Sequence, residues 1–290
     1  LVGRPNAGKS TLTNALVGSK VAITSDTPQT TRHRLRAVIN LDDAQVVLVD
    51  TPGLHKPHDA LGEELNRSAL KSLEDVDVVA MLVDATKPVG TGDEWVAGHV
   101  AKARTGARIL VLTKADIASE KAVEAQLAKA KSLVDWDEIV VLSAAEGFNL
   151  DGFMAAVVPH LPEGPRWFPT DMPTDQSLEV MVAEFVREKI LRTTFDEVPH
   201  AVGVQVEQLE YVKKTDLTRI WAVIYVERDS QKGIIIGKGG EAIKRVGTEA
   251  REDLERLLGT KVFLELTVKV KKGWRRDASQ IRRFGYGEGL

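Results

Sequence analysis

The fold of this chain is decided by the stretch Gly3-Arg4-Pro5-Asn6-Ala7-Gly8-Lys9-Ser10. It fits the pattern G-x-x-x-x-G-K-[ST], in which backbone N–H groups surround phosphates, the lysine reaches the β- and γ-phosphates and the hydroxyl holds Mg²⁺. The apolar pair Leu1-Val2 precedes it and a predicted helix follows, as such a loop requires. A glycine turn without function is the alternative, but a chance match is expected in only about 1% of such chains. The predicted nucleotide-binding residues of this loop are Gly3, Asn6, Ala7, Gly8, Lys9, Ser10 and Thr11.

A second motif, Asp50-Thr51-Pro52-Gly53, ends the predicted strand 45–49. An acid there can hold Mg²⁺ through water, and the glycine N–H can meet the γ-phosphate. The polar stretch 24–32, called the switch segment below, has no apolar period and predicts a mobile segment whose threonine completes the Mg²⁺ shell. We prefer Thr31 to Thr30 for this role, and a solvated loop is the alternative. The predicted metal ligands are Ser10, Thr31 and Asp50, and the predicted catalytic residues are Lys9, Thr31 and Gly53.

A third motif, Thr113-Lys114-Ala115-Asp116, follows the predicted strand 108–112 and resembles the [NT]-K-x-D motif with which GTPases bind the base. The Asp116 carboxylate can accept hydrogen bonds from N1–H and the N2 amine of guanine, whereas adenine offers no such pair of donors. Lys114 can lie along the ring. A strand end followed by an aspartate that caps the next helix is the alternative. Ser143-Ala144-Ala145, after the strand 139–142, resembles the weaker fifth GTPase motif, so the expected ligands are GTP and GDP with Mg²⁺.

Composition limits the class of protein. The chain has 290 residues, 43% of them hydrophobic, which predicts about two ordinary globular domains and excludes a disordered or fibrous chain. The 39 Lys and Arg against 42 Asp and Glu exclude nucleic-acid binding through bulk charge alone. The absence of cysteine excludes disulfides, thiol nucleophiles and thiolate metal sites and fits a reducing compartment, so we expect a cytoplasmic protein. The longest apolar runs, 78–83 and 109–112, are far shorter than the roughly 20 residues that cross a bilayer.

The chain divides near residue 165. Residues 1–165 carry 17 basic and 22 acidic side chains, and 166–290 carry 22 and 20. Five of the eleven prolines lie between them, at 159, 162, 165, 169 and 173, and proline stiffens a linker. We predict one domain at 1–165, a linker at 166–176 and a second domain at 177–290. Because the chain opens inside a predicted strand without Met, we expect a trimmed N-terminus.

The two parts differ in the order of their predicted elements. In the first, short buried strands alternate with longer helical stretches such as 121–133, which predicts an α/β fold with a doubly wound parallel sheet. In the second, a helix at 177–192 precedes strands at 201–211 and 220–227. A glycine-rich turn, an amphipathic helix at 241–258 and a strand at 261–271 follow. This order predicts an α+β domain.

The glycine-rich turn contains I-G-x-x-G-x-x-I at 236–243, the pattern of a KH domain. In such domains a GXXG turn after a strand clamps the backbone of about four nucleotides, because glycine has no Cβ to obstruct a sugar-phosphate strand. A basic tail follows, and a glycine hairpin with a solvated cationic terminus is the alternative. The predicted RNA-binding residues are Ile236, Gly237, Lys238, Gly239, Gly240, Lys271, Lys272, Arg275 and Arg276.

The first domain resembles the translation-factor-related class of GTPases, because P-N-A-G-K-S, P-Q-T-T-R, D-T-P-G-L, T-K-A-D and S-A-A occur in the order of that class. Leu54 stands where Ras-like enzymes carry a glutamine that orients the attacking water, so we expect slow intrinsic hydrolysis. In related GTPases with an apolar residue here, an asparagine that matches Asn6 helps to bind a potassium ion. The resemblance therefore implies K⁺ as a further cofactor.

The pairing of this GTPase domain with a C-terminal KH domain of the α-β-β-α-β kind resembles the Era family from residue 1 to about Trp274. The resemblance implies a GTP-hydrolysing switch that binds small-subunit (16S) ribosomal RNA near its 3′ end and assists assembly of the 30S subunit. It also implies peripheral association with the inner membrane, which no amphipathic helix of the sequence supports independently. We further expect a monomer.

Other interpretations fit less well. A P-loop ATPase or kinase does not explain Asp116, and an RNA-binding protein with a degenerate pocket does not explain the joint presence of Lys9, Ser10 and Asp50. The KH pattern argues against tRNA-modification and tandem-domain GTPases. The alternative that stays open is another GTPase of the translation-factor class that acts on a different RNA.

Overall fold

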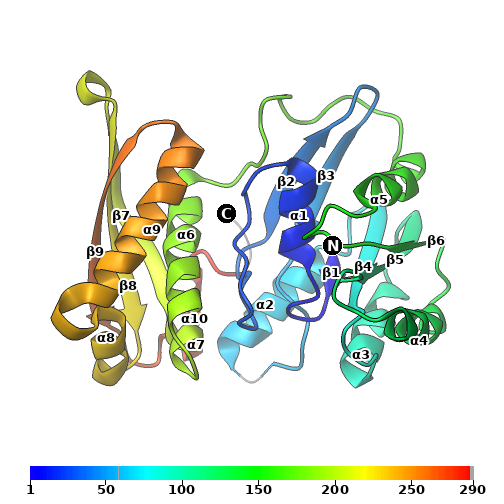
Figure 1. Cartoon of the computed structure of the whole chain (residues 1–290), viewed down its shortest axis with the longest axis horizontal. Coiled ribbons are helices and arrows are strands. Elements are labelled where there is room, and N and C mark those ends of the chain that lie inside the picture. Colours follow the sequence, from blue (N-terminus) through cyan, green and yellow to red (C-terminus); the bar gives the residue numbers. More distant parts are fainter. Residues whose placement is uncertain (58, 288–290) are drawn as a thin grey trace.

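The chain folds into two lobes, and the computed structural model describes residues 1–57 and 59–287 (Figure 1). The first lobe runs from β1 to α5 and the second from α6 to β9. Residues 288–290 of the predicted second domain lie outside the described residues. Within the described ranges, no helix combines the length and the apolar character of a membrane span.

A parallel sheet in the order β1-β4-β5-β6 forms the centre of the first lobe. Its strands are β1 (Val2–Gly3), β4 (Val78–Asp84), β5 (Ala107–Thr113) and β6 (Glu138–Val141). Successive strand residues face opposite sides, so Leu82 packs toward α1 and α5 whereas Met81 packs toward α2, α3 and α4. Helices thus cover both faces and confirm the predicted doubly wound fold. They are α1 (Lys9–Val17), α2 (Ala60–Lys71), α3 (Thr91–Val100), α4 (Glu120–Lys131), α5 (Leu150–Val157) and the short η1 (Val158–His160).

An antiparallel hairpin of β2 (Leu35–Asn40) and β3 (Gln45–Asp50) lies beside β1. β2 is not among the predicted strands, because the exposed Arg36 interrupts its short apolar run. The N of Leu1 donates to the carbonyl oxygen of Val49 at 2.8 Å, which fixes the hairpin against the sheet. Asp50 therefore lies at the same sheet edge as the loop after β1.

The proline-rich connection, predicted as a spacer, is held along the hairpin. The N of Val38 donates to the carbonyl oxygen of Pro173 at 2.9 Å, and Ala37 and Thr174 form an isolated antiparallel bridge. Gln45 at the other end of the hairpin accepts from the N of Trp167 at 2.7 Å. The edge of β2 supplies the hydrogen-bond partners that proline cannot offer within the segment.

The second lobe is a three-stranded sheet in the order β7-β8-β9, with α6 and α9 against one face (Figure 1). β7 and β8 are antiparallel, and β8 and β9 are parallel. The elements are α6 (Leu178–Thr193), α7 (Val198–Ala201), β7 (Gly203–Val212), η2 (Lys213–Thr215), β8 (Leu217–Val226), α8 (Asp229–Ile236), η3 (Lys238–Gly240), α9 (Glu241–Leu258) and β9 (Lys261–Val270).

One prediction about this lobe is wrong. The GXXG turn follows the helix α8 and not a strand, and with the short α7 the order contains two α-helices more than α-β-β-α-β. The basic tail after β9 is folded. It forms η4 (Trp274–Arg276) and α10 (Ala278–Arg283), and its apolar side chains pack between the lobes in one cluster of Leu61, Leu65, Val223, Tyr225, Trp274, Ile281, Phe284 and Tyr286.

Candidate nucleotide-binding site

The phosphate-binding loop leads directly into α1, whose first turn carries Lys9 and Ser10. Lys9 is buried, and its Nζ donates to the carbonyl oxygens of Gly3 at 3.3 Å and Arg4 at 3.0 Å. Burial lowers the pKa of Lys9 to about 8, and the nearby Asp50 carboxylate partly opposes this shift. The amine is thus held by weak partners at the centre of the loop, where a phosphate would be a stronger one.

Most of the predicted loop residues face a cleft of about 800 Å³. The loop residues that line the cleft are Asn6, Gly8, Lys9, Ser10 and Thr11. Gly3 and Ala7 belong to the same loop but are buried. The opposite wall consists of the switch segment and of residues from the second lobe, among them Arg192, Phe195 and His200. The second lobe therefore borders the nucleotide site.

The three predicted metal ligands meet at one point. The Ser10 hydroxyl donates to Asp50 Oδ2 at 2.6 Å and lies 2.8 Å from the Thr31 hydroxyl oxygen. Thr30 points elsewhere, because its hydroxyl lies 2.7 Å from the Ser25 hydroxyl and donates to the carbonyl oxygen of Thr27 at 2.6 Å. The structure thus brings Thr31, and not Thr30, to the other two ligands.

The side-chain oxygens of Ser10, Thr31 and Asp50 fit Mg²⁺, which prefers oxygen ligands and keeps several bound waters. Asp50 is fully buried, and among the described residues its Oδ1 has no hydrogen-bond partner. Burial raises the pKa of Asp50, although Lys9 and the Ser10 hydroxyl oppose the shift. A buried carboxylate oxygen without a partner is costly, and a cation beside it would remove that cost.

Gly53 and Leu54 follow Asp50 closely. A Cβ on Gly53 would lie 2.6 Å from the Cα and N of Pro5, so only glycine lets the end of this motif approach the phosphate-binding loop. Leu54 is fully buried among the apolar residues under the sheet. Because it is buried there, the Leu54 side chain cannot contact an attacking water. Because it is apolar, it also cannot hydrogen-bond to one.

The base-binding loops have a polar support that the sequence analysis missed. The Thr113 hydroxyl donates to the carbonyl oxygen of Ala7 at 2.9 Å, which ties this loop to the phosphate loop. Lys114 has a φ of 61° and donates to Asp84 Oδ2 at 2.7 Å. Asp84 is buried at the end of β4. Its pKa is lowered, because hydrogen bonds from Lys114 and Thr86 outweigh the effect of burial.

The other predicted base-binding residues are Asp116, on this same loop, and Ser143 to Ala145, on the loop after β6. Asp116 is exposed, Ser143 is buried, and Ala144 and Ala145 become more exposed in turn. The N of Ala115 donates to the carbonyl oxygen of Leu142 at 3.3 Å, so the two loops are in contact. Nothing in the sequence marks Asp84, except that it too ends a strand of the parallel sheet.

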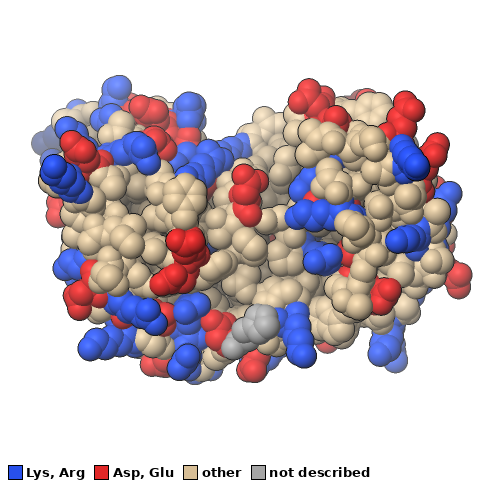
Figure 2. Space-filling model, turned by 60° about the horizontal axis from the view of Figure 1, so that its bottom comes forward, with Lys and Arg blue, Asp and Glu red and all other residues tan. Residues whose placement is uncertain are grey.

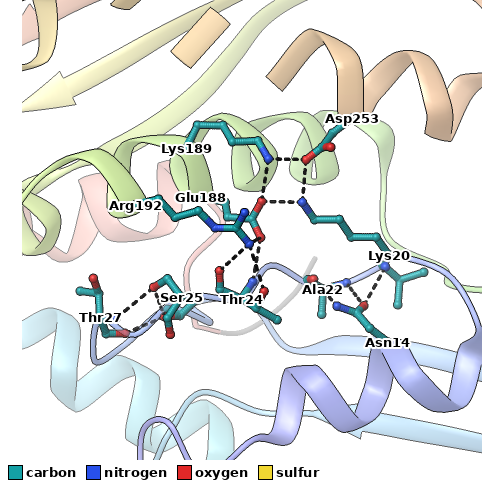
Figure 3. A network of polar contacts seen from close by, with 12 residues as sticks. Asn14, Lys20, Ala22, Thr24, Ser25, Thr27, Glu188, Lys189, Arg192 and Asp253 are labelled. Carbon is teal, nitrogen blue, oxygen red and sulfur yellow. Dashed lines mark hydrogen bonds and ion pairs between the residues drawn. The ribbon is translucent and has the colours of Figure 1, made fainter. Parts of the chain in front are cut away.

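The switch segment is bound to α6 at its beginning (Figure 3). The backbone N of Thr24 donates to Glu188 Oε1 at 3.0 Å, and Arg192 reaches the carbonyl oxygen of Thr24 at 3.3 Å. Lys20, just before the segment, donates to Asp253 of α9 at 2.6 Å and ion-pairs with Glu188 at 2.5 Å. The sequence analysis assigned no role to these second-lobe residues, because contacts between distant segments leave no local pattern.

The predicted RNA-binding turn joins α8 to α9. Gly237, Gly239 and Gly240 have φ values of 72°, 62° and 82°, and Lys238 is exposed between them. Ile236 ends α8 and is partly buried against the core of the second lobe. Figure 2 shows that Lys and Arg side chains on this lobe, at the left, alternate with acidic ones. The face in that view therefore has no continuous basic surface.

The predicted basic residues of the tail differ in their surroundings. Lys272 and Arg276 are exposed. Arg275 ion-pairs with Glu227 at 2.9 Å and with Asp59 of the first lobe at 3.4 Å. Lys271 donates to Gln280 and lies over the ring of Tyr225, 5.6 Å from its centroid. Of the four residues, Lys272 and Arg276 are therefore the most accessible to RNA.

Comparison with known proteins matches both parts of the chain. Residues 1–114 match a family described as 50S ribosome-binding GTPase, and residues 197–275 match the KH domain family. A variant of Aquifex aeolicus Era bound to GDP·AlF4⁻ is 39% identical, with coverage of 99% of this chain and 97% of that chain and a TM-score of 0.94. Era in complex with MgGDPNP and nucleotides 1506–1542 of 16S ribosomal RNA is 38% identical, with the same coverage and TM-score.

Proposed function

The chain belongs to the Era family of GTPases, and from this membership we propose that it hydrolyses GTP and binds small-subunit 16S ribosomal RNA near its 3′ end. In this role it assists assembly and maturation of the 30S subunit. We place it in the cytoplasm, where its ribosomal partner is assembled.

GTP binding and hydrolysis are proposed from one observation: the side chains of Ser10, Thr31 and Asp50 converge beside the buried Lys9. Ser10, Thr31 and Asp50 are proposed to hold Mg²⁺, the last through water. Bound Mg²⁺ would neutralise charge that develops on the phosphates. Lys9 would bind the β- and γ-phosphates, the N–H of Gly53 would meet the γ-phosphate, and Asp116 would bind guanine.

Potassium is proposed at Asn6. Its amide nitrogen donates to the carbonyl oxygen of Asp26 in the switch segment at 2.6 Å, so both residues offer oxygen atoms at the mouth of the phosphate loop. A cation there would supply positive charge at the phosphates, because Arg32 of the switch segment is buried against the second lobe. Replacing sodium by potassium is expected to speed hydrolysis, and equal rates in both salts would remove K⁺ from the proposal.

RNA is proposed to bind at the GXXG turn, with the exposed Lys238, Lys272 and Arg276 contacting phosphates. The relative that binds nucleotides 1506–1542 supports the 3′ end of 16S RNA as the target. Peripheral membrane association and a monomeric state remain predictions from the family resemblance.

One experiment tests both parts of the proposal. The protein is crosslinked to RNA in cells, purified, and assayed for release of phosphate from GTP while the crosslinked RNA is sequenced. We expect Mg²⁺-dependent hydrolysis that Lys9→Ala abolishes, together with reads from the 3′ end of 16S RNA. Hydrolysis with reads from another RNA would instead favour a GTPase of the same class with a different target.

A further inference from the structure

Three of the four residues from Thr30 to His33 are held by segments from beyond the first lobe, and the exception is Thr31. The carbonyl oxygen of Thr30 accepts a hydrogen bond from Arg187 of α6. Arg32 and His33 contact the second lobe and the segment that follows it. The Thr31 hydroxyl instead meets Ser10 of the first lobe.

Arg187 is held rigidly where it meets Thr30. Its side chain is fully buried, and its Nε and an Nη donate to the two carboxylate oxygens of Glu184 at 2.9 and 2.7 Å. Such a two-pronged pair fixes the plane of the guanidinium. Glu184 also lies 3.4 Å from His33 Nδ1, so the same pair borders the chain on both sides of Thr31.

Arg32 is fixed in a cage of backbone and aromatic groups. Its Nη atoms donate to the carbonyl oxygens of Val202 at 2.6 Å and His200 at 3.1 Å. The guanidinium carbon lies 5.3 Å from the ring centroid of Tyr286 and 5.8 Å from that of Trp274. Arg32 is 1% exposed, so its guanidinium has exchanged water for these partners.

The beginning of the switch segment is fixed by the same helix. Ile23 packs in an apolar cluster with residues of α6, and Thr24 is bonded to Glu188 and Arg192. Positions 184, 187, 188 and 192 are spaced as one face of a helix. That face of α6 therefore contacts the segment at both ends and leaves Thr31 directed at Ser10.

We propose that Arg187 of α6 is a positioning residue for GTP hydrolysis, which fixes the backbone of Thr30 and thereby holds the Thr31 hydroxyl at the Mg²⁺ site. This inference rests on the proposed function, because Thr31 matters to hydrolysis only if it binds the metal. A threonine held in place before the metal arrives loses less conformational entropy when it binds. Arg187 thus contributes to the nucleotide site although it does not line the cleft.

The test compares the Mg²⁺ dependence of GTP hydrolysis in full-length variants without RNA. The double variant Arg187→Met/Glu184→Gln removes both charges of the buried pair together, so neither is left unpaired. We expect the Mg²⁺ concentration for half-maximal hydrolysis to rise about tenfold, since roughly that factor corresponds to one lost positioning contact. GDP affinity measured without Mg²⁺ should be unchanged, because Thr31 is not needed for it.

Two controls separate positioning from damage to the fold. Arg245→Met/Glu249→Gln makes the same substitutions in an exposed pair of α9 and should leave the Mg²⁺ requirement as in the unmodified protein. Arg187→Lys keeps a donor for Thr30 and a charge for Glu184, and its Mg²⁺ requirement should lie between those of the unmodified protein and the double variant.

A double-mutant cycle with Thr31→Ala gives the decisive result. If Arg187 acts through Thr31, adding the Arg187/Glu184 substitutions to Thr31→Ala should change the Mg²⁺ requirement no further. An equal increase in both backgrounds, or no increase in either, overturns the inference. Absence of Mg²⁺-dependent hydrolysis in the unmodified protein would instead contradict the proposed function, so the two failures are distinguishable.

Discussion

Among the single residues of the site, Lys9 combines two opposing features, because its ammonium group is charged and its side chain is buried. Its amine is buried beside a buried carboxylate, and within residues 1–57 and 59–287 its hydrogen bonds go only to carbonyl oxygens of its own loop. Burial disfavours the ammonium, so its pKa falls from the usual value for lysine to about 8. A phosphate would favour the ammonium, so nucleotide binding should raise this pKa again.

The first prediction follows from that shift. Because the ammonium binds phosphate, GDP binding measured without Mg²⁺ should take up close to half a proton near pH 8 and almost none at pH 6.5. Above pH 8 the affinity should fall by roughly tenfold per pH unit until the pKa of the bound state is reached. Calorimetry in buffers of different ionisation enthalpy measures the proton uptake. An uptake that does not change between pH 6.5 and 8.5 would show that Lys9 titrates elsewhere.

The second prediction concerns the choice of base. Asp116→Asn places an amide donor opposite N1–H and the N2 amine of guanine, so GTP affinity should drop by about 3 kcal/mol, or roughly 100-fold. Xanthosine triphosphate, which has an acceptor at that position, should bind better than GTP. Competition binding with GTP, XTP and ATP measures this preference. Unmodified protein that binds ATP as well as GTP would refute guanine selectivity.

The residues of the nucleotide site were largely predictable from sequence because each sits at the end of a strand or in a glycine loop. Lys9, Ser10 and Asp50 belong to short motifs whose chemistry is local. Thr31 was preferred to Thr30 without a geometric reason, which the hydroxyl contact with Ser10 now supplies. Arg187 and Asp84 were not predictable, since their roles depend on contacts between segments distant in sequence.

At the scale of elements, the GXXG turn depends on α8, which the sequence analysis missed. Gly233 and three consecutive isoleucines disfavour a helix by intrinsic preference, so tertiary packing must decide there. Ile235 is buried in the core of the lobe, which supplies that packing. The turn is therefore fixed between two packed helices and is not a hairpin after a strand.

The third prediction uses the different surroundings of the glycines. A Cβ on Gly237 would lie 2.7 Å from the Cβ of Ala242, so substitution there damages the fold, whereas nothing lies within 4 Å of a Cβ on Gly240. Gly240→Asp should abolish specific RNA binding and leave GTP affinity unchanged. Gly240→Asn is the matched control, because both residues tolerate a positive φ and only one is charged. Full RNA affinity in Gly240→Asp would remove the KH clamp from the proposal.

The fourth prediction separates the basic residues after β9. Lys272→Ala/Arg276→Ala should reduce the slope of log K against log salt by about 1.4 if each residue contacts one phosphate of single-stranded RNA. Arg275→Ala should chiefly lower stability, because it leaves Glu227 and Asp59 without their ion-pair partner. RNA binding across a salt series and thermal unfolding measure the two effects. An unchanged slope for the double variant would place the phosphate contacts on other residues.

At the scale of the whole molecule, the lobes are held together by charge as well as by apolar packing. Lys20 joins Glu188 and Asp253 (Figure 3). Arg187, paired with Glu184, contacts Thr30 of the switch segment. The division into two parts and both fold classes were predictable from charge, prolines and periodicity. The contact between them was not, because hydrogen bonds and apolar contacts between segments distant in sequence leave no pattern in the basic tail or in the proline-rich linker.

The last prediction is that acid separates the lobes before it unfolds them. The pKa values of Glu184, Glu188 and Asp253 are all lowered, because the cations and hydrogen-bond donors around each carboxylate outweigh its burial. A carboxyl group whose pKa is lower in the folded state stabilises that state above its unfolded pKa, about 4 for Asp and Glu, and this stabilisation is lost as the pH falls further. All three groups lie where the lobes meet, whereas each lobe keeps its own apolar core.

Small-angle scattering and far-UV circular dichroism from pH 7 to pH 3 measure the two events. We expect the radius of gyration to increase below about pH 4 while the helix signal persists. Asp253→Asn already lacks one charge, so its lobes should separate at a higher pH than those of the unmodified protein. Glu249→Gln, on the exposed face of α9, is the control and should leave the separation unchanged. If size and helix signal change together in every variant, the apolar clusters, and not the carboxylates, hold the lobes in place.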